Sequence, residues 1–213
     1  MRLSWVRKSR LSVEKGQTPE AAADAVSAAV ATHLARRGKA VELQLPPGYQ
    51  HLAPSILRLH ETVPFERAVF VMMKFPDRVQ MDPWQIGLLN DIWTTIRNQL
   101  RGCGLIALRA DKRKYHDQLW ENVCVYMLGC RFGIAVLEDR VASELNPNIA
   151  LEYGFMRAMD RRVGLFRNVG FKHGRADLSG KLMNEFIVSN EGRLRTNTLK
   201  SALTQWLTDV GVT

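Results

Sequence analysis

One glutamate, Glu152, lies in a sequence context that favours chemistry over packing. It follows the pair Asn146-Pro147, which predicts a helix start because the asparagine side chain can cap the helix and proline presets the first helical φ. Asn148 lies four residues before Glu152, so both side chains should share one helix face near the positive end of the helix. An ionised carboxylate held there can stabilise positive charge on a ligand or bond to it covalently.

An ordinary salt bridge, or a favourable interaction with the helix dipole, is the alternative explanation for this acid. No basic residue lies three or four positions away from it; the neighbours there are Asn148, Ile149, Phe155 and Met156. The predicted helix over 149–159 is apolar nearly all round, which is typical of a buried helix. A carboxylate on such a helix is costly unless it faces a polar cavity or a distant partner, so Glu152 is a candidate functional residue.

Four apolar runs predict buried strands of a sheet that positions this helix; they are residues 68–73, 105–108, 132–137 and 163–166. Helical spacing predicts helices over 83–100, 117–130, 178–186 and 198–210, with a further short strand at 186–188. Strands that alternate with helices need crossovers, which give an open, mostly parallel sheet with helices on both faces. The ligand crevice of such an α/β sheet lies beyond the carboxyl ends of its strands.

Polar and aromatic residues that follow the predicted strands are candidates for ligand binding, together with the two asparagines at the predicted helix start: Lys74, Phe75, Arg109, Asp111, Asp139, Asn146 and Asn148. Lys74 can contact a phosphate as a point charge or be a solvated loop lysine. Asp111 can hold a ribose hydroxyl or cap the following helix. Arg109 and the basic run 112–114 favour a phosphorylated ligand over a bare nucleoside.

The aromatic residues have two interpretations. Tyr153 and Phe75 can stack on a base, or they can belong to the core beside the sheet. Trp84, Trp93 and Trp120 lie at apolar positions of predicted helices, which favours packing.

The run from Asn146 to Gly154, Asn-Pro-Asn-Ile-Ala-Leu-Glu-Tyr-Gly, resembles the motif shared by nucleoside 2-deoxyribosyltransferases and TIR-like nucleotide-binding domains. Segments 69–75, 108–111 and 133–139 are similar to the first strand, the loop after the second strand, and the third strand with its acidic end. The resemblance covers roughly residues 68–170, in order. The loop after the first strand departs from a phosphate cradle because it contains no glycine.

The resemblance implies a flavodoxin-like sheet that binds a nucleoside or nucleotide and breaks its N-glycosidic bond, with Glu152 as the catalytic residue. Breaking this bond develops positive charge on the sugar, which a carboxylate can stabilise. TIR enzymes typically cleave NAD⁺, whereas deoxyribosyltransferases exchange one base for another. The basic residues favour NAD⁺, so we expect a glycohydrolase that takes NAD⁺ as substrate and uses no cofactor.

Three further interpretations stay open beside this expectation. By analogy with bacterial TIR-like proteins, the enzyme would be a defence effector. Two alternatives to NAD⁺ hydrolysis are nucleoside deoxyribosyl transfer and the sensing of a nucleotide without turnover.

Residues 1–62 are predicted to form a basic appendage to a nucleotide-site domain at 63–213. Residues 1–60 hold nine Lys/Arg and four Asp/Glu, against 21 and 17 in the remainder. The pattern predicts an alanine-rich helix over about 19–37 and a short strand at 41–45. We expect this appendage to mediate homo-oligomer formation or the docking of a partner protein. The net charge of +9 makes nucleic acid a secondary candidate partner.

Composition bounds the remaining possibilities. With 46% hydrophobic and 24% charged residues, the chain has the balance of a packed globular protein. No apolar run approaches the roughly 18–20 residues of a membrane helix, and the N-terminal residues lack a signal-peptide pattern, so we expect a cytoplasmic protein that does not bind a membrane. The three cysteines and five histidines lack metal-ligand spacing, so we expect no metal site and buried, reduced thiols.

Overall fold

The computed structural model of the chain describes residues 27–28, 45–141, 146–171 and 183–212. The chain divides into two compact units, Met1–Leu57 and Arg58–Thr213.

Little of the first unit lies within the described residues. Residues 27 and 28 are helical, and from residue 45 onward the chain forms the 3₁₀ helix η1 (Pro47–Leu52) and enters helix α2 (Ala53–His60). The remainder of the helix predicted over 19–37, and residues 41–44 of the predicted strand, lie outside the described residues.

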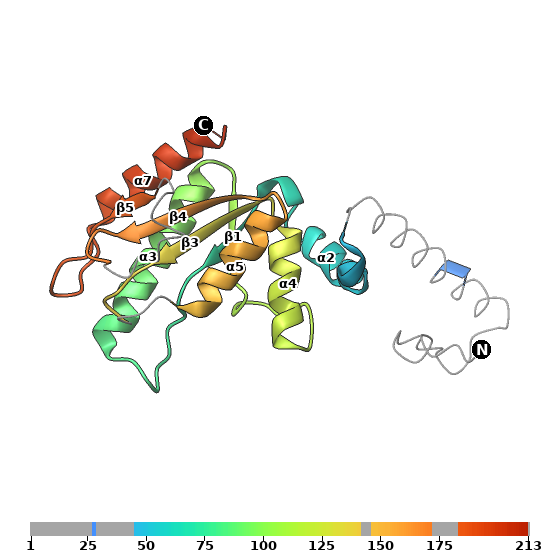
Figure 1. The fold of residues 1–213 in the computed structure, drawn as a ribbon, viewed down its shortest axis with the longest axis horizontal. Coiled ribbons are helices and arrows are strands. Elements are labelled where there is room, and N and C mark those ends of the chain that lie inside the picture. Colours follow the sequence, from blue (N-terminus) through green and yellow to red (C-terminus); the bar gives the residue numbers. More distant parts are fainter. Residues whose placement is uncertain (1–26, 29–44, 142–145, 172–182, 213) are drawn as a thin grey trace. The chain divides into compact units, whose positions relative to one another are not determined.

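The second unit is an α/β domain built on five parallel strands (Figure 1). The strands are β1 (Ala68–Met72), β2 (Ile106–Leu108), β3 (Phe132–Leu137), β4 (Arg162–Asn168) and β5 (Asn184–Phe186). Their order across the sheet is β2-β1-β3-β4-β5, and every neighbouring pair is parallel. This is the strand order of flavodoxin-like folds, in which the order reverses between β1 and β3. The predicted open α/β sheet is confirmed.

Helices cover both faces of this sheet (Figure 1). Helices α3 (Pro83–Gly102) and α7 (Thr196–Asp209) pack together on one face, and α4 (Leu119–Gly129) and α5 (Pro147–Ala158) pack together on the other. Every residue of β1 and β3 is buried, as their continuous apolar runs predicted. The central strands thus lie between two helical layers, which position their carboxyl ends.

Two elements differ from the sequence-based expectation. The helix predicted over 178–186 is wrong at residues 183–186, of which 184–186 form β5, and its residues 178–182 lie outside the described residues. The short strand predicted at 186–188 begins two residues too late. Beyond β5, Val188 pairs with Leu194 in an isolated antiparallel bridge. The polar residues of this three-residue edge strand give it almost no apolar pattern, so neighbouring apolar residues set the wrong boundaries.

Helix α2 was not predicted from the sequence, although its signal is present. Leu52, Ile56 and Leu59 recur at helical spacing, and all three are fully buried. Pro46 and Pro47 begin the 3₁₀ helix η1 that leads into α2.

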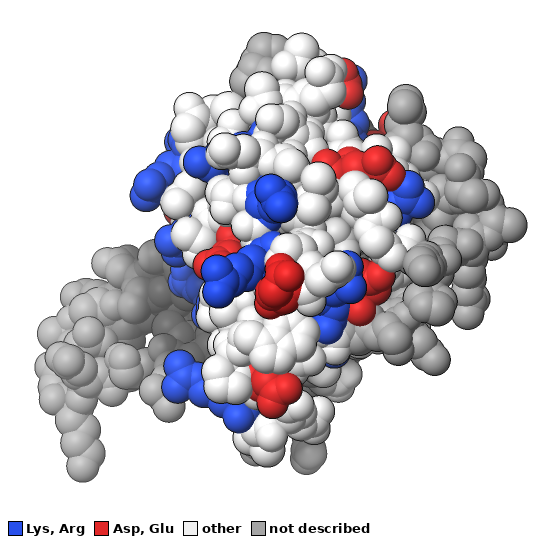
Figure 2. Space-filling view, turned by 90° about the vertical axis from the view of Figure 1, so that its left-hand side faces the viewer, with Lys and Arg blue, Asp and Glu red and all other residues white. Residues whose placement is uncertain are grey.

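None of the helices in the described ranges combines the length and the hydrophobicity of a membrane span. On the face of the molecule in Figure 2, acidic side chains lie between the lysine and arginine side chains.

Candidate functional site

A pocket lies at the carboxyl ends of β1 and β3, where the strand order reverses. It is lined by Met73, Lys74, Leu89, Val136, Leu137, Glu138, Asn146, Ile149 and Phe171. A reversal leaves a crevice at the sheet edge because the chain connections from the two strands run to opposite sides. The crevice expected at the strand ends is therefore present between β1 and β3.

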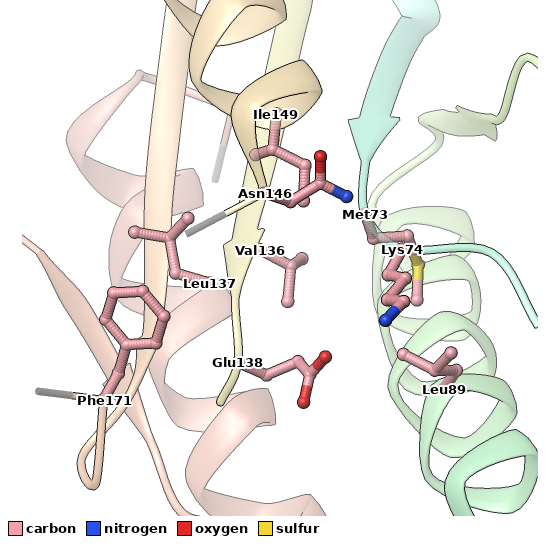
Figure 3. A pocket seen from close by; sticks show the side chains of 9 residues that line it. All are labelled: Met73, Lys74, Leu89, Val136, Leu137, Glu138, Asn146, Ile149 and Phe171. Atoms are coloured by element: carbon pink, nitrogen blue, oxygen red, sulfur yellow. The ribbon is translucent and has the colours of Figure 1, made fainter. Parts of the chain in front are cut away.

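Two charged side chains face each other across this pocket, Lys74 after β1 and Glu138 after β3 (Figure 3). Glu138 is only 8% exposed, and its Oε2 accepts hydrogen bonds from the backbone N–H groups of Arg140 (3.0 Å) and Val141 (2.9 Å). Burial raises the pKa of Glu138, while these hydrogen bonds and the charge of Lys74 oppose the rise. The ammonium group of Lys74 forms no hydrogen bond or ion pair with the part of the chain that the structure describes.

The start of α5 forms a third wall of the pocket. Asn146 is the N-cap of this helix, and its side chain accepts a hydrogen bond of 2.9 Å from the backbone N–H of Asn148. Pro147 occupies the first helical position, so the predicted helix start is confirmed. Asn146 lines the pocket, whereas the exposed Asn148 does not.

Glu152 lies on α5 at the border of the stripe that packs on the sheet. Ile149, Tyr153 and Met156 form this buried stripe, and Glu152 is half-buried beside it. Its carboxylate forms no hydrogen bond or ion pair with any described residue, and burial raises its pKa to about 7. Glu152 does not itself line the pocket, but Ile149, one helical turn before it, does.

The two residues after β2 that were predicted to bind a ligand, Arg109 and Asp111, form an ion pair with each other. Arg109 is 2% exposed, and its Nε and Nη2 donate hydrogen bonds of 2.8 Å and 2.6 Å to the two carboxylate oxygens of Asp111. The guanidinium also lies over the rings of Trp93 (4.7 Å) and Phe75 (5.2 Å). Burial acts to raise the pKa of Asp111, but Arg109 and Lys112 lower it below its usual range. Through these contacts Arg109 connects the loops after β1 and β2 with α3. The ligand contacts predicted for Arg109 and Asp111 stay predictions.

The remaining residues predicted to bind a ligand, Asp139, Tyr153 and Phe75, differ in how exposed they are and in what they contact. Asp139 accepts a hydrogen bond of 2.9 Å from the Asn168 side chain at the end of β4, which connects the β3 and β4 loops. Tyr153 is 7% exposed and belongs to the core, so the described structure gives it no free face for a base. Phe75 is 39% exposed, with one face against Arg109.

Glu138 is the functional candidate that the sequence analysis missed. In the sequence it is the first of two acidic residues that follow the apolar run of β3, and the prediction named the second, Asp139. Whether the first or the second residue turns into the pocket depends on the backbone after the strand, which local sequence does not reveal.

A more open hollow adjoins the pocket and shares Lys74 with it. It is lined by Lys74, Phe75, Pro76, Asp77, Arg78, Gln80, Met81, Gln85 and Val141. Asp77 is engaged by its own loop, because its Oδ1 accepts from the N–H groups of Val79 (2.8 Å) and Gln80 (3.3 Å). Lys74 and Arg78 are thus the charged groups that this hollow offers to an anionic ligand.

The described residues do not bring together three or more His, Cys, Asp or Glu side chains at a place that could hold a metal ion. Burial raises the pKa of the free thiols of Cys124, to about 11, and of Cys130, so neither is an activated nucleophile.

The chain was compared with protein-family models, with curated proteins and with solved structures, and none of them matches. The chemistry of this site must therefore be inferred from its own residues.

Proposed function

We propose that the protein cleaves the N-glycosidic bond of a nucleotide, with NAD⁺ as the substrate and Glu152 as the catalytic carboxylate. The observation that carries this proposal is the half-buried Glu152, which has no partner among the described residues and a pKa raised to about 7. A protein keeps a carboxylate in such surroundings at a cost in stability, and this cost is typical of functional sites.

The proposed reaction needs one carboxylate and a water molecule. The bond between the nicotinamide nitrogen and C1′ of the ribose breaks, and its electron pair leaves with nicotinamide, which becomes neutral without receiving a proton. The positive charge that develops at C1′ is stabilised by Glu152 or captured by it as a covalent ribosyl ester. Water then attacks C1′ and gives ADP-ribose and a proton. Partial burial strengthens the charge stabilisation because it lowers the effective dielectric constant.

The basic groups near the pocket favour a phosphorylated substrate over a bare nucleoside. Lys74 belongs to both the pocket and the adjoining hollow, and Arg78 belongs to the hollow. The diphosphate of a dinucleotide can lie in the open hollow beside these two cations. This arrangement supports NAD⁺ hydrolysis over deoxyribosyl transfer, the alternative enzymatic reaction.

A second candidate function is the binding of a nucleotide without turnover. It is favoured by the position of Glu152, which does not line the pocket as described. The two functions make different predictions for the wild-type protein, since a sensing module binds NAD⁺ but releases no nicotinamide.

The test is to incubate the full-length protein separately with NAD⁺ and with a mixture of deoxynucleosides and free bases, and to separate the products by chromatography. We expect nicotinamide and ADP-ribose from NAD⁺, and no base exchange. Base exchange would identify a deoxyribosyltransferase, and binding of NAD⁺ without products would identify a sensing module.

We also propose that residues 1–62 act in self-assembly or in docking a partner, and that the enzyme acts as a bacterial defence effector. Activity per molecule that rises with protein concentration would support assembly. Activity that is independent of concentration, down to the lowest measurable range, would contradict it.

A further inference from the structure

The open hollow beside the loop after β1 is large enough for a nucleotide. Its volume is about 550 Å³, within the roughly 300–1,000 Å³ that is typical of small-molecule sites. The loop after β1 forms one side of it, and Gln85 near the start of α3 and Val141 after β3 complete its walls. The hollow therefore lies at the carboxyl edge of the sheet, where α/β folds bind their ligands.

Phe75 presents aromatic surface to this hollow. The residue lines the hollow and is 39% exposed, although it is apolar. The guanidinium of Arg109 lies 5.2 Å from the centroid of its ring and is itself fixed by two hydrogen bonds to Asp111. The ring is thus held in place by a buried ion pair and offers its exposed surface to a base that stacks on it.

The charged groups of the hollow favour an anion next to this ring. Lys74 and Arg78 are cations, and Asp77 is an acid whose carboxylate is engaged by two backbone N–H groups of its own loop. Lys74 also interacts electrostatically with Glu138, so Arg78 is the cation whose charge is least compensated. A phosphate monoester beside an aromatic ring is the ligand chemistry that these groups recognise.

We propose that this hollow binds the adenylate half of NAD⁺, with adenine stacked on Phe75 and its phosphate beside Lys74 and Arg78. The inference rests on the proposed function, because it identifies which end of the substrate lies in the hollow. Gln80 and Gln85 line the same hollow, and their amide groups can form hydrogen bonds with the edge of the base.

The charge of the two rings decides between the two ends of NAD⁺. Nicotinamide carries a positive charge in NAD⁺, whereas adenine is neutral. A second cation on the Phe75 ring would lie near the guanidinium of Arg109 and the two cations of the hollow, and like charges repel. The carboxylate of Glu152 on α5 instead attracts a cationic ring. Adenine therefore fits the hollow better than nicotinamide does.

Two substitutions separate the contact with the base from the contact with the phosphate. Phe75→Leu keeps an apolar side chain but removes the stacking surface, whereas Phe75→Tyr retains that surface. Arg78→Gln removes one cation and leaves the ring unchanged. Arg97→Gln is the matched control for charge, because Arg97 is exposed on α3 and does not line the hollow.

The measurement is the dissociation constant of AMP, adenosine and inorganic phosphate for each full-length protein, by calorimetry or ligand-observed NMR. Phe75→Leu should weaken the binding of AMP and adenosine by about fivefold or more, because the stacking contact is lost, and leave phosphate binding unchanged. Arg78→Gln should weaken the binding of AMP and phosphate by about threefold and leave adenosine unchanged. Phe75→Tyr and Arg97→Gln should bind all three ligands as the wild-type protein does.

Competition with AMP tests the orientation of the substrate. Adenosine should displace AMP from the wild-type protein. The competitor 1-methylnicotinamide, a cationic nicotinamide ring that has no bond to ribose, should not displace it. Displacement of AMP by 1-methylnicotinamide but not by adenosine would show that the orientation is the opposite one.

Three results overturn the proposal: AMP binding that is undetectable at millimolar concentration, AMP binding that is equally tight in wild-type protein, Phe75→Leu and Arg78→Gln, or equal weakening by Phe75→Leu and Phe75→Tyr. Thermal melting of each variant checks its folding. Arg78→Gln changes an exposed side chain, so it supplies the decisive comparison if Phe75→Leu does not fold.

AMP contains no nicotinamide–ribose bond, so its binding is measured separately from nicotinamide release. The expected binding pattern in a protein that releases no nicotinamide would support the adenylate site and contradict the proposed function. Release of nicotinamide from NAD⁺ with the wild-type KM in both Phe75→Leu and Arg78→Gln would do the reverse.

Discussion

Glu152 is a carboxylate whose ionisation should control the reaction at neutral pH. Burial raises its pKa from an ordinary value of 4.5 to about 7, and only the ionised form can stabilise positive charge at C1′. We therefore expect kcat/KM for NAD⁺ to be low at pH 5.5 and to rise with pH, with a midpoint near pH 7. Nicotinamide release measured from pH 5 to 9 checks this. A rate that is constant across that range would show that a group with this pKa does not limit catalysis.

At the residue scale, the sequence predicted the helix start at Asn146, which depends on residues close together in the chain. It missed the ion pair after β2, which depends on side-chain conformation. Asn146 caps α5 as its type and the following proline indicated. The absence of a basic residue at helical spacing from Glu152 was visible in the sequence, but the prediction that this helix is buried was wrong. Only Ile149, Tyr153 and Met156 of α5 are buried, and the apolar Leu151 is 55% exposed.

The Arg109–Asp111 ion pair was not predicted, because the sequence indicated a ligand for Arg109 and a ribose hydroxyl or a helix cap for Asp111. Only the side-chain conformations show that the two residues bind each other.

At the element scale, the packing of α7 on β4 depends on a glycine. A Cβ atom added at Gly164 would lie 2.7 Å from the Phe166 ring and 2.8 Å from the Trp206 ring. These two rings also pack edge to face, with centroids 5.9 Å apart, so neither can move without disturbing the other. The site depends on this packing because β4 lies beside β3, whose end carries Glu138.

We predict that Gly164→Ala lowers the free energy of unfolding by about 2–3 kcal/mol, through overpacking. Gly133→Ala should cost less, about 1 kcal/mol, because its closest contacts include the flexible ends of Met72 and Met156, both at 2.9 Å. Gly154→Ala is the control, since no atom would contact the added methyl group and alanine favours a helix. Urea denaturation measures all three, and a Gly164→Ala protein as stable as the Gly154→Ala protein would contradict this account of the packing.

The strands that form continuous apolar runs were predictable, including β2, whose three residues are only half-buried. β1 and β3 are continuous apolar runs, and their predicted positions match the structure to within one residue. β5 was misplaced because it is a short edge strand whose Glu185 is exposed and paired with Arg167 of β4. The order of the strands was not derivable from local patterns, because crossover direction leaves no periodic signal; only the family resemblance implied it.

At the scale of the whole molecule, the net charge of +9 raises the question of a nucleic-acid partner. On the face in Figure 2 the charges of both signs are interspersed, which does not favour a phosphate backbone there. We predict that duplex DNA leaves the rate of nicotinamide release unchanged at about 150 mM salt, where non-specific contacts are weak. Inhibition or activation by DNA at this salt concentration, diminishing steeply as salt is added, would instead establish nucleic acid as a partner.

The central claim is that Glu152 cleaves the nicotinamide–ribose bond, and one comparison of initial rates tests it most directly. Nicotinamide release from NAD⁺ is measured for the wild-type protein, for Glu152→Gln and for Asp91→Asn, the same chemical change at an exposed position of α3. We predict that Glu152→Gln lowers the rate by about 10³-fold, while Asp91→Asn has the wild-type rate and calorimetry shows that all three proteins bind NAD⁺. Equal rates for Glu152→Gln and wild-type protein would contradict the claim.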